Sequence, residues 1–227
     1  MAIQVRILPA PELYLRDPQE TDLGRRILNA SIRLIDQLGL EDFTFKKLAV
    51  DLGSAEASIY RYFSSKHQLL LYLTSWYWDW VHHLVNQAVV SQPDAKGRLK
   101  AAIGALTRPF ISNPGVSYID ERVLHQVVIN EGSKTYHTKS VDRENNNGAF
   151  LGYKNLSDEI SQLLLEIRPG FEYPHALATS LFEMAHNHPY FAEHLPRLTD
   201  LKAGKSLSGD LEKMLWFWVS KLLECQD

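Results

Sequence analysis

Apolar side chains recur every three or four positions along most of this chain, which is the spacing of one buried helix face. No stretch alternates apolar and polar residues as a half-buried strand would. The pattern therefore predicts an all-α protein. Helices are expected at residues 23–38, 44–52, 55–63, 66–90, 94–111, 117–130, 147–167, 173–187 and 208–224.

Proline and glycine mark the breaks between the later helices. They occur at Asn113-Pro114-Gly115, Arg168-Pro169-Gly170 and His188-Pro189, and a proline ends or interrupts a helix because it has no N–H to donate. The chain turns polar between Gly132 and Gly148. We expect a loop there.

The stretch from Thr44 to Phe63 predicts two short helices joined by a tight turn. Thr44 can cap the first helix, and Gly53 supplies the left-handed residue that ends it. Ser54 can cap the second helix, in which Ile59 and Phe63 point inward together. This is the layout of a helix-turn-helix, whose second helix reads DNA bases.

The combined pattern is more specific than its parts. Thr-x-x-x-Leu-Ala-x-x-x-Gly, followed by Ile-Tyr-x-Tyr-Phe-x-x-Lys-x-x-Leu, resembles the TetR/AcrR family of bacterial transcription regulators over residues 20–73. The resemblance implies a three-helix DNA-binding domain and, after it, a helical domain for ligand binding and dimerisation. The expected boundaries are an N-terminal arm at residues 1–19, the DNA-binding domain at 20–66 and the ligand-binding and dimerisation domain at 67–227.

Carried over position by position, the resemblance also implies a set of DNA contacts. Hydroxyl and ammonium groups suit phosphates, whereas short or bidentate side chains read base edges. Contacts with bases and the nearby backbone fall on Glu56, Ala57, Ser58, Tyr60 and Arg61, and phosphate contacts fall on Thr44, Lys46, Tyr62 and Lys66. We expect Glu56 and Arg61 to select bases and Tyr62 and Lys66 to supply affinity.

Glu56 departs from the family pattern, which usually has a basic or polar residue at this position. As a structural residue it would favour a helix N-terminus by about 0.3–1 kcal/mol. As a functional residue it could accept a hydrogen bond from a cytosine amino group. Both interpretations stay open.

The charge of the chain does not suggest a non-specific nucleic-acid coat. The formal net charge is −3 and the pI about 6.3, and residues 16–72 contain eight Lys/Arg and eight Asp/Glu. DNA binding must therefore depend on where the cations lie, and the affinity should fall steeply as salt rises.

The last predicted helix is apolar nearly all round, which favours burial on more than one side. In the family the last two helices form a four-helix interface between two subunits, so a homodimer is expected on one DNA operator. Its half-sites would lie roughly 34 Å, or a small multiple, apart. The expected interface residues are Leu211, Met214, Leu215, Trp218 and Leu222.

The resemblance further implies a small-molecule effector in the C-terminal domain, whose binding releases the operator. Such a pocket is mostly apolar with a few polar groups, and its candidate walls suggest a hydrophobic or aromatic ligand. Residues of these types are more often plain core than pocket walls. The candidate walls are Trp76, Trp80, Phe110, Tyr118, His125, Phe150, Tyr153 and Phe182.

Other kinds of site find little support in the sequence. The single cysteine, Cys225, fits a reducing cytoplasm, and the apolar stretch 69–85 is interrupted by Asp79, His82 and His83, which argues against a membrane span. His186 and His188 are two apart, not the spacing of a zinc site, and no catalytic motif or cofactor-binding motif is evident.

The sequence therefore predicts a cytoplasmic, non-enzymatic, dimeric DNA-binding regulator without a cofactor or metal, most simply a repressor released by its ligand. The alternative is a helical small-molecule-binding or enzymatic domain with a vestigial DNA-binding head. The neutral charge of that head and the acidic Glu56 support this alternative.

Overall fold

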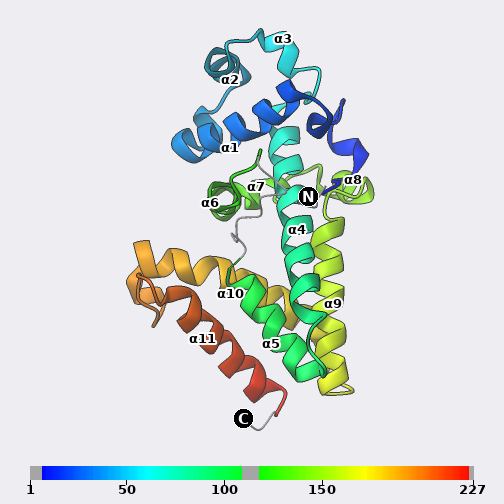
Figure 1. Ribbon diagram of the computed structural model, residues 1–227, viewed down its shortest axis with the longest axis vertical. Coiled ribbons are helices and arrows are strands. Elements are labelled where there is room, and N and C mark those ends of the chain that lie inside the picture. Colours follow the sequence, from blue (N-terminus) through cyan, green and yellow to red (C-terminus); the bar gives the residue numbers. More distant parts are fainter. Residues whose placement is uncertain (1–6, 109–117, 225–227) are drawn as a thin grey trace. The chain divides into compact units, whose positions relative to one another are not determined.

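The computed structural model describes residues 7–108 and 118–224, and every regular element in these ranges is a helix (Figure 1). The prediction of an all-α protein is thus confirmed. The elements are η1 Pro11–Leu13, η2 Pro18–Glu20, α1 Asp22–Asp42, α2 Phe45–Leu52, α3 Glu56–Ile59, α4 Lys66–Val89, α5 Ala95–Leu106, α6 Glu121–Glu131, α7 Ser133–Tyr136, α8 Val141–Asn146, α9 Leu151–Ile167, α10 Pro174–His194, η3 Pro196–Leu198 and α11 Leu207–Leu222.

Two predictions about the later helices are wrong. The segment 132–148 was expected to be a loop but contains α7 and α8. The second concerns α10, which was expected to end before Pro189 but continues to His194. Ala185 and Ala192 are 4% and 7% exposed, so α10 is buried on both sides of the proline, and this packing offsets the one hydrogen bond that the proline removes.

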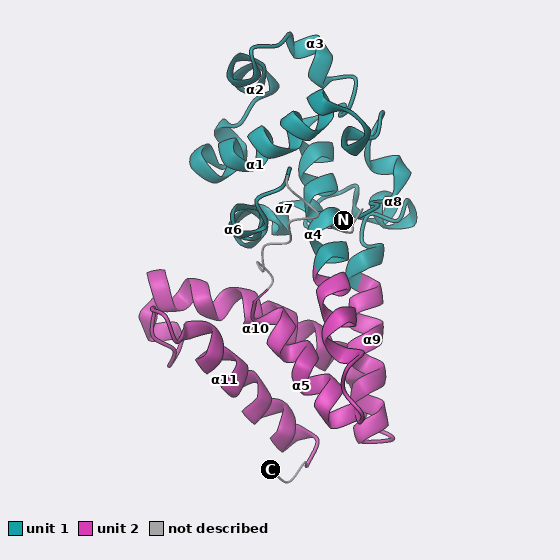
Figure 2. Ribbon diagram, viewed as in Figure 1, with its two compact units in different colours: residues 1–80, 110–153 teal, residues 81–109, 154–227 magenta. Residues whose placement is uncertain are grey.

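The chain forms two compact units, whose boundary falls within α4 and within α9 (Figure 2). Unit 1 comprises residues 1–80 and 110–153, and unit 2 comprises residues 81–109 and 154–227. Unit 1 therefore joins the helix-turn-helix to α6, α7 and α8, which are distant in sequence. The domain boundaries proposed from the sequence stay a prediction.

In unit 1, α1 packs against both α2 and α6. Its N-terminus is capped by Thr21, whose hydroxyl accepts the Gly24 N–H at 3.0 Å. Regular helix geometry is interrupted at Gly39, with φ 72° and ψ 161°, a conformation that glycine adopts without the steric penalty of a Cβ. This kink leads the chain into the short connection before α2.

In unit 2, α10 and α5 each pack against α11. Leu211, Leu215 and Val219 of α11 are fully buried, and they recur at the four-residue spacing of one helix face. Ion pairs at the surface join Arg98 to Glu166 and Arg108 to Glu212. In the described ranges of the chain, no helix is long and apolar enough to cross a membrane.

Candidate nucleic-acid interface

The turn between α2 and α3 has the geometry that the sequence predicted. The Thr44 hydroxyl accepts the Lys47 N–H at 3.2 Å and caps α2. Gly53 is left-handed (φ 61°, ψ 39°), and the N–H groups of Gly53 and Ser54 donate to the carbonyls of Val50 and Ala49 at 3.2 and 3.0 Å. These two bonds form the Schellman arrangement that closes a helix.

The start of α3 differs from the prediction. Ala55, not Ser54, is the N-cap, and no side chain caps the helix. The Ser54 hydroxyl instead donates to the Ala55 carbonyl at 3.3 Å. The regular helix is also short, Glu56–Ile59, and continues as turns to Tyr62. Ile59 and Phe63 are both fully buried, as predicted.

Most of the predicted DNA contacts lie on the surface. Thr44, Lys46, Ala57, Tyr60 and Arg61 are exposed, and Glu56 and Ser58 are half-buried. The Tyr60 ring is 47% exposed and stands edge-on to Phe45, with the ring centroids 5.0 Å apart. The described residues of unit 1 thus leave the outer face of α3 uncovered.

Tyr62 and Lys66, for which phosphate contacts were predicted, also have hydrogen-bond partners within the protein. Tyr62 is only 2% exposed, and its hydroxyl lies 2.7 Å from the Thr21 hydroxyl. The Lys66 ammonium donates to three carbonyls at the end of α1, those of Leu40, Glu41 and Phe43, at 2.8, 3.0 and 3.4 Å. Both side chains therefore hold α1 against the segment that follows α3.

The eight cations of residues 16–72 divide into two groups. Five donate to acceptors within unit 1: Arg25 to the Gln19 carbonyl, Arg26 to the Leu52 carbonyl, Arg33 to Asp51, Lys47 to the Asp42 carbonyl, and Lys66 as above. For Arg16, Lys46 and Arg61, the described residues offer neither an ion pair nor a hydrogen bond to the side chain, and all three are exposed. We refer to these three as the unpaired cations.

The residues predicted to line an effector pocket are divided between the units. Trp76, Trp80, Tyr118, His125, Phe150 and Tyr153 belong to unit 1, Phe182 belongs to unit 2, and Phe110 lies outside the described residues. Trp76 stacks on Trp80 with ring centroids 5.8 Å apart, and Tyr153 stacks on Trp78 at 4.2 Å. An effector pocket at these residues stays a prediction.

In unit 1, His125 makes a polar contact with Tyr77, which lies between Trp76 and Trp78 in the sequence. The hydroxyl of Tyr77 is 2.8 Å from Nδ1 of His125, and both residues are buried. Burial lowers the pKa of His125 to about 4 and raises that of Tyr77. The imidazole is therefore neutral at pH 7, and its tautomer decides which of the two groups donates the hydrogen bond.

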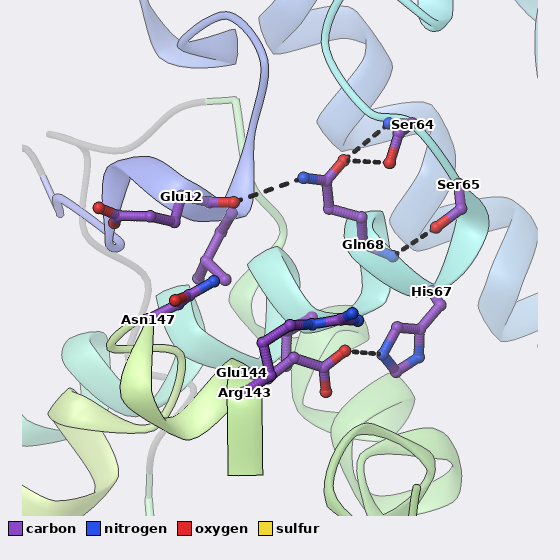
Figure 3. A pocket seen from close by; sticks show the side chains of 10 residues that line it. Glu12, Ser64, Ser65, His67, Gln68, Arg143, Glu144 and Asn147 are labelled. Carbon is purple, nitrogen blue, oxygen red and sulfur yellow. Dashed lines mark hydrogen bonds and ion pairs between the residues drawn. The ribbon is translucent and has the colours of Figure 1, made fainter. Parts of the chain in front are cut away.

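A cavity of about 230 Å³ lies elsewhere in unit 1, where the chain leaves the helix-turn-helix (Figure 3). Gln68 lies on one side of this cavity, where its amide oxygen accepts a hydrogen bond from the Ser64 N–H at 2.7 Å. On another side, Nε2 of His67 is 2.9 Å from a carboxylate oxygen of Glu144. The lining is polar, which differs from the apolar pocket expected from the sequence. It comprises Glu12, Leu13, Ser64, Ser65, His67, Gln68, Leu71, Arg143, Glu144 and Asn147.

The predicted dimer residues of α11 face in different directions. Leu211 and Leu215 are fully buried in the single chain. Trp218 and Leu222 are 36% and 49% exposed, and Met214 is half-buried. Phe217, which is 56% exposed, was not among the expected interface residues, although the all-round apolar pattern of the helix had indicated it.

The histidines of α10 have contacts with neighbouring side chains. Nδ1 of His188 lies 2.9 Å from the Thr199 hydroxyl, and its ring stands edge-on to Trp218. Nowhere in residues 7–108 or 118–224 do three or more His, Cys, Asp or Glu side chains form a group that could hold a metal ion.

Residues 27–73 match the family model described as bacterial regulatory proteins, tetR family. The resemblance expected from the sequence motif is confirmed, and this segment is a TetR-type helix-turn-helix. A curated relative, the nucleoid occlusion factor SlmA of Photobacterium profundum, is 26% identical over 102 residues, which are 44% of this chain and 52% of the relative. The match thus spans about half the length of that protein.

Solved structures are similar over most of the chain. A bacterial regulatory protein in the tetR family from Rhodococcus RHA1 has a TM-score of 0.63 at 12% identity, covering 90% of this chain and 97% of its own. AibR in complex with isovaleryl coenzyme A and operator DNA has 0.58 at 16%, covering 88% and 98%. The fatty acid degradation regulator FadR from Bacillus halodurans has 0.57 at 18%, covering 84% and 93%. At these identities the likeness establishes a shared fold.

Proposed function

We propose that this protein is a sequence-specific DNA-binding regulator of transcription that acts as a homodimer in the cytoplasm, without enzymatic activity. The observation that carries the proposal is the uncovered face of α3, which lies between a capped α2 and a long α4 in a helix-turn-helix. An exposed second helix of this kind enters the major groove.

The exposed residues have two roles, contacts with bases and contacts with phosphates. Glu56, Ala57, Ser58, Tyr60 and Arg61 meet base edges and the nearby backbone, with Glu56 and Arg61 selecting sequence. Lys46 and Thr44, at the start of α2, bind phosphates and fix the position of α3 on the duplex. Lys46 and Arg61 have no hydrogen bond or ion pair to any residue in the described part of the chain. This supports these roles, because neither side chain has to break such a bond before it binds DNA.

Tyr62 and Lys66 contribute differently from the other members of the set. Their hydrogen bonds to Thr21 and to the end of α1 keep α3 at a fixed angle to α1. We propose that they increase affinity by holding the reading surface in shape.

Dimerisation is proposed through the exposed apolar residues of α11. Phe217, Trp218 and Leu222 leave a large apolar area uncovered in the monomer, and burying apolar surface against a second copy stabilises the assembly by about 25 cal/mol per Å². A dimer also presents two copies of α3 to two half-sites, which explains how a short reading helix can specify an operator.

Regulation is proposed to follow from a hydrophobic or aromatic effector that binds more tightly to a conformation that does not fit DNA. Only such a difference in affinity shifts the population, and equal binding to both conformations would change nothing. AibR, which has a similar fold, has been solved in complex with isovaleryl coenzyme A and operator DNA, so this fold is compatible with binding both a small molecule and DNA.

Selection from a random DNA library tests the proposal directly. The purified chain should enrich a palindromic sequence whose half-sites lie about 10 base pairs, or a multiple of that spacing, apart. Arg61→Ala and Glu56→Ala should each relax the preference at particular base pairs, by about 1–3 kcal/mol per position. Enrichment of no sequence at low salt would contradict the proposal and favour a helical domain with a vestigial DNA-binding head.

A further inference from the structure

Arg16 is the one unpaired cation that lies outside the helix-turn-helix. It belongs to the segment before α1, which sequence motifs did not connect with DNA. We propose that Arg16 binds the phosphate backbone beside α3, so that the segment 7–20 is part of the DNA interface. The inference rests on the proposed function and adds a new element to its interface.

The segment is fixed at the point where α3 ends. The N–H of Leu15, the residue before Arg16, donates to the Tyr62 carbonyl at 2.8 Å. Leu13 is 2% exposed, and the Gln68 side chain reaches the Glu12 carbonyl at 3.5 Å. The backbone just before Arg16 is therefore attached to the segment that carries the reading helix.

The chain is also fixed after Arg16. The Gln19 amide donates to the Ile7 carbonyl at 2.6 Å and to the Tyr72 hydroxyl at 3.0 Å. Its oxygen accepts the Tyr118 hydroxyl at 2.6 Å. Pro18 packs so closely on α1 that a Cβ at Gly24 would overlap its backbone. With both sides held, only the side chain of Arg16 keeps its freedom.

Tyr62 restricts that remaining freedom. The Arg16 guanidinium lies over the Tyr62 ring, 5.6 Å from the ring centroid, which is within the range of an attractive cation–π contact. The ring itself is held by its hydroxyl contact with Thr21. A guanidinium ordered in advance loses less entropy when it binds, and its planar fork of donors matches a phosphate.

The charges around α3 identify DNA as the partner of this arginine. Arg61 precedes Tyr62 in the chain and Arg16 covers its ring, so two exposed cations flank the end of the reading helix. Six further cations lie in residues 16–72, and all of them except Lys46 already donate hydrogen bonds within unit 1. A domain with no net charge gains its affinity from its few available cations, and Arg16 is one of three.

The experiment uses the full-length chain and the duplex selected from the random library, with a scrambled duplex as the second probe. Fluorescence anisotropy at several salt concentrations compares the wild type with Arg16→Ala and Arg16→Lys. Arg197→Ala, which removes the same charge from an exposed site in unit 2, is the matched control. Thermal melting verifies that the variants remain folded.

Arg16→Ala should weaken binding about threefold to tenfold on both duplexes. The slope of log affinity against log salt should fall by about 0.9 for each lost phosphate contact, or about 1.8 for two heads. Arg16→Lys should keep the slope and lose part of the affinity, because an ammonium matches neither the ring nor the phosphate as well.

Equal affinities and slopes for Arg16→Ala, Arg197→Ala and the wild type would overturn this inference and leave the proposed function standing. A loss confined to particular base pairs would also overturn it, because a phosphate contact does not depend on sequence. A wild type that binds neither duplex at low salt would overturn the proposed function, and the inference with it.

Discussion

At the scale of single residues, the interface is built from two kinds of side chain. Exposed groups such as Lys46 and Arg61 have no internal partner among the described residues, whereas Tyr62 and Lys66 use their polar atoms inside unit 1. Sequence motifs cannot separate these two kinds, because both kinds are polar and lie at matching positions. Only the hydrogen bonds tell them apart.

Lys66→Met should separate stability from DNA binding. Methionine keeps the apolar stem but loses the three bonds to the carbonyls at the end of α1, so the free energy of unfolding should fall by about 2 kcal/mol. Urea denaturation measures that loss. The salt dependence of DNA affinity should match the wild type, whereas Lys46→Ala should flatten it. A flattened slope for Lys66→Met would show instead that this ammonium binds phosphate.

Gly53→Ala should destabilise the turn of the helix-turn-helix. No atom lies within 4 Å of a Cβ built at this position, so the whole cost comes from the left-handed backbone, about 1–2 kcal/mol. Gly53→Asn should cost less because asparagine tolerates this conformation better. Chemical denaturation of the wild type, Gly53→Ala and Gly53→Asn measures their free energies of unfolding and so their order of stability. Equal stability of the alanine and glycine forms would contradict the role of this turn.

The buried His125 makes stability depend on pH. Its pKa is about 4 in the folded chain and about 6.5 when unfolded. The contribution of the neutral imidazole to the free energy of unfolding is therefore complete above pH 6.5. The contribution is lost as the pH falls towards 4, and its full size is about 3 kcal/mol. Thermal melting at pH 7.5 and pH 5 should show a smaller drop for His125→Gln than for the wild type. Equal drops would contradict a neutral, buried imidazole.

At the scale of elements, periodicity located the long helices but not the short ones. The apolar spacing of residues 66–90 predicted α4 almost to its last residue, and Gly53 predicted the end of α2. By contrast, α7 and α8 span only four and six residues, too few to repeat a hydrophobic period. Long-range packing also kept α10 helical past Pro189, and no local signal could have revealed it.

The same limit applies to the candidate site. The position of α3 and its inward residues followed from a local pattern. The role of Arg16 did not, because it depends on a contact between the segment 7–20 and Tyr62 that spans more than forty positions of the sequence. Contacts of this kind appear only when the chain is folded.

At the scale of the whole molecule, the exposed apolar residues of α11 are the surface through which we propose that a second copy binds. Leu222 is 49% exposed and Trp218 is 36% exposed, although both lie on a helix whose opposite face is buried. A charge placed there would have to lose its water in an interface, which is costly when no opposite charge meets it.

Leu222→Glu should therefore convert a dimer into monomers, as measured by light scattering coupled to size exclusion. Leu151→Glu, at a 56% exposed leucine of α9 in unit 1, is the matched control and should leave the mass unchanged. The monomeric variant should also lose most of its affinity for a two-half-site duplex, because each head would then bind alone. A wild type that is already monomeric in solution and on DNA would contradict the homodimer.

We propose above all that the uncovered face of α3 reads a DNA sequence. The most direct measurement is the affinity of the wild type for the selected duplex and for its scrambled counterpart, at salt concentrations from about 50 to 200 mM. We expect a preference of at least about 10³-fold for the selected duplex and a steep loss of affinity on both duplexes as salt rises. Equal affinity for the two duplexes, or an affinity that salt does not change, would contradict this proposal.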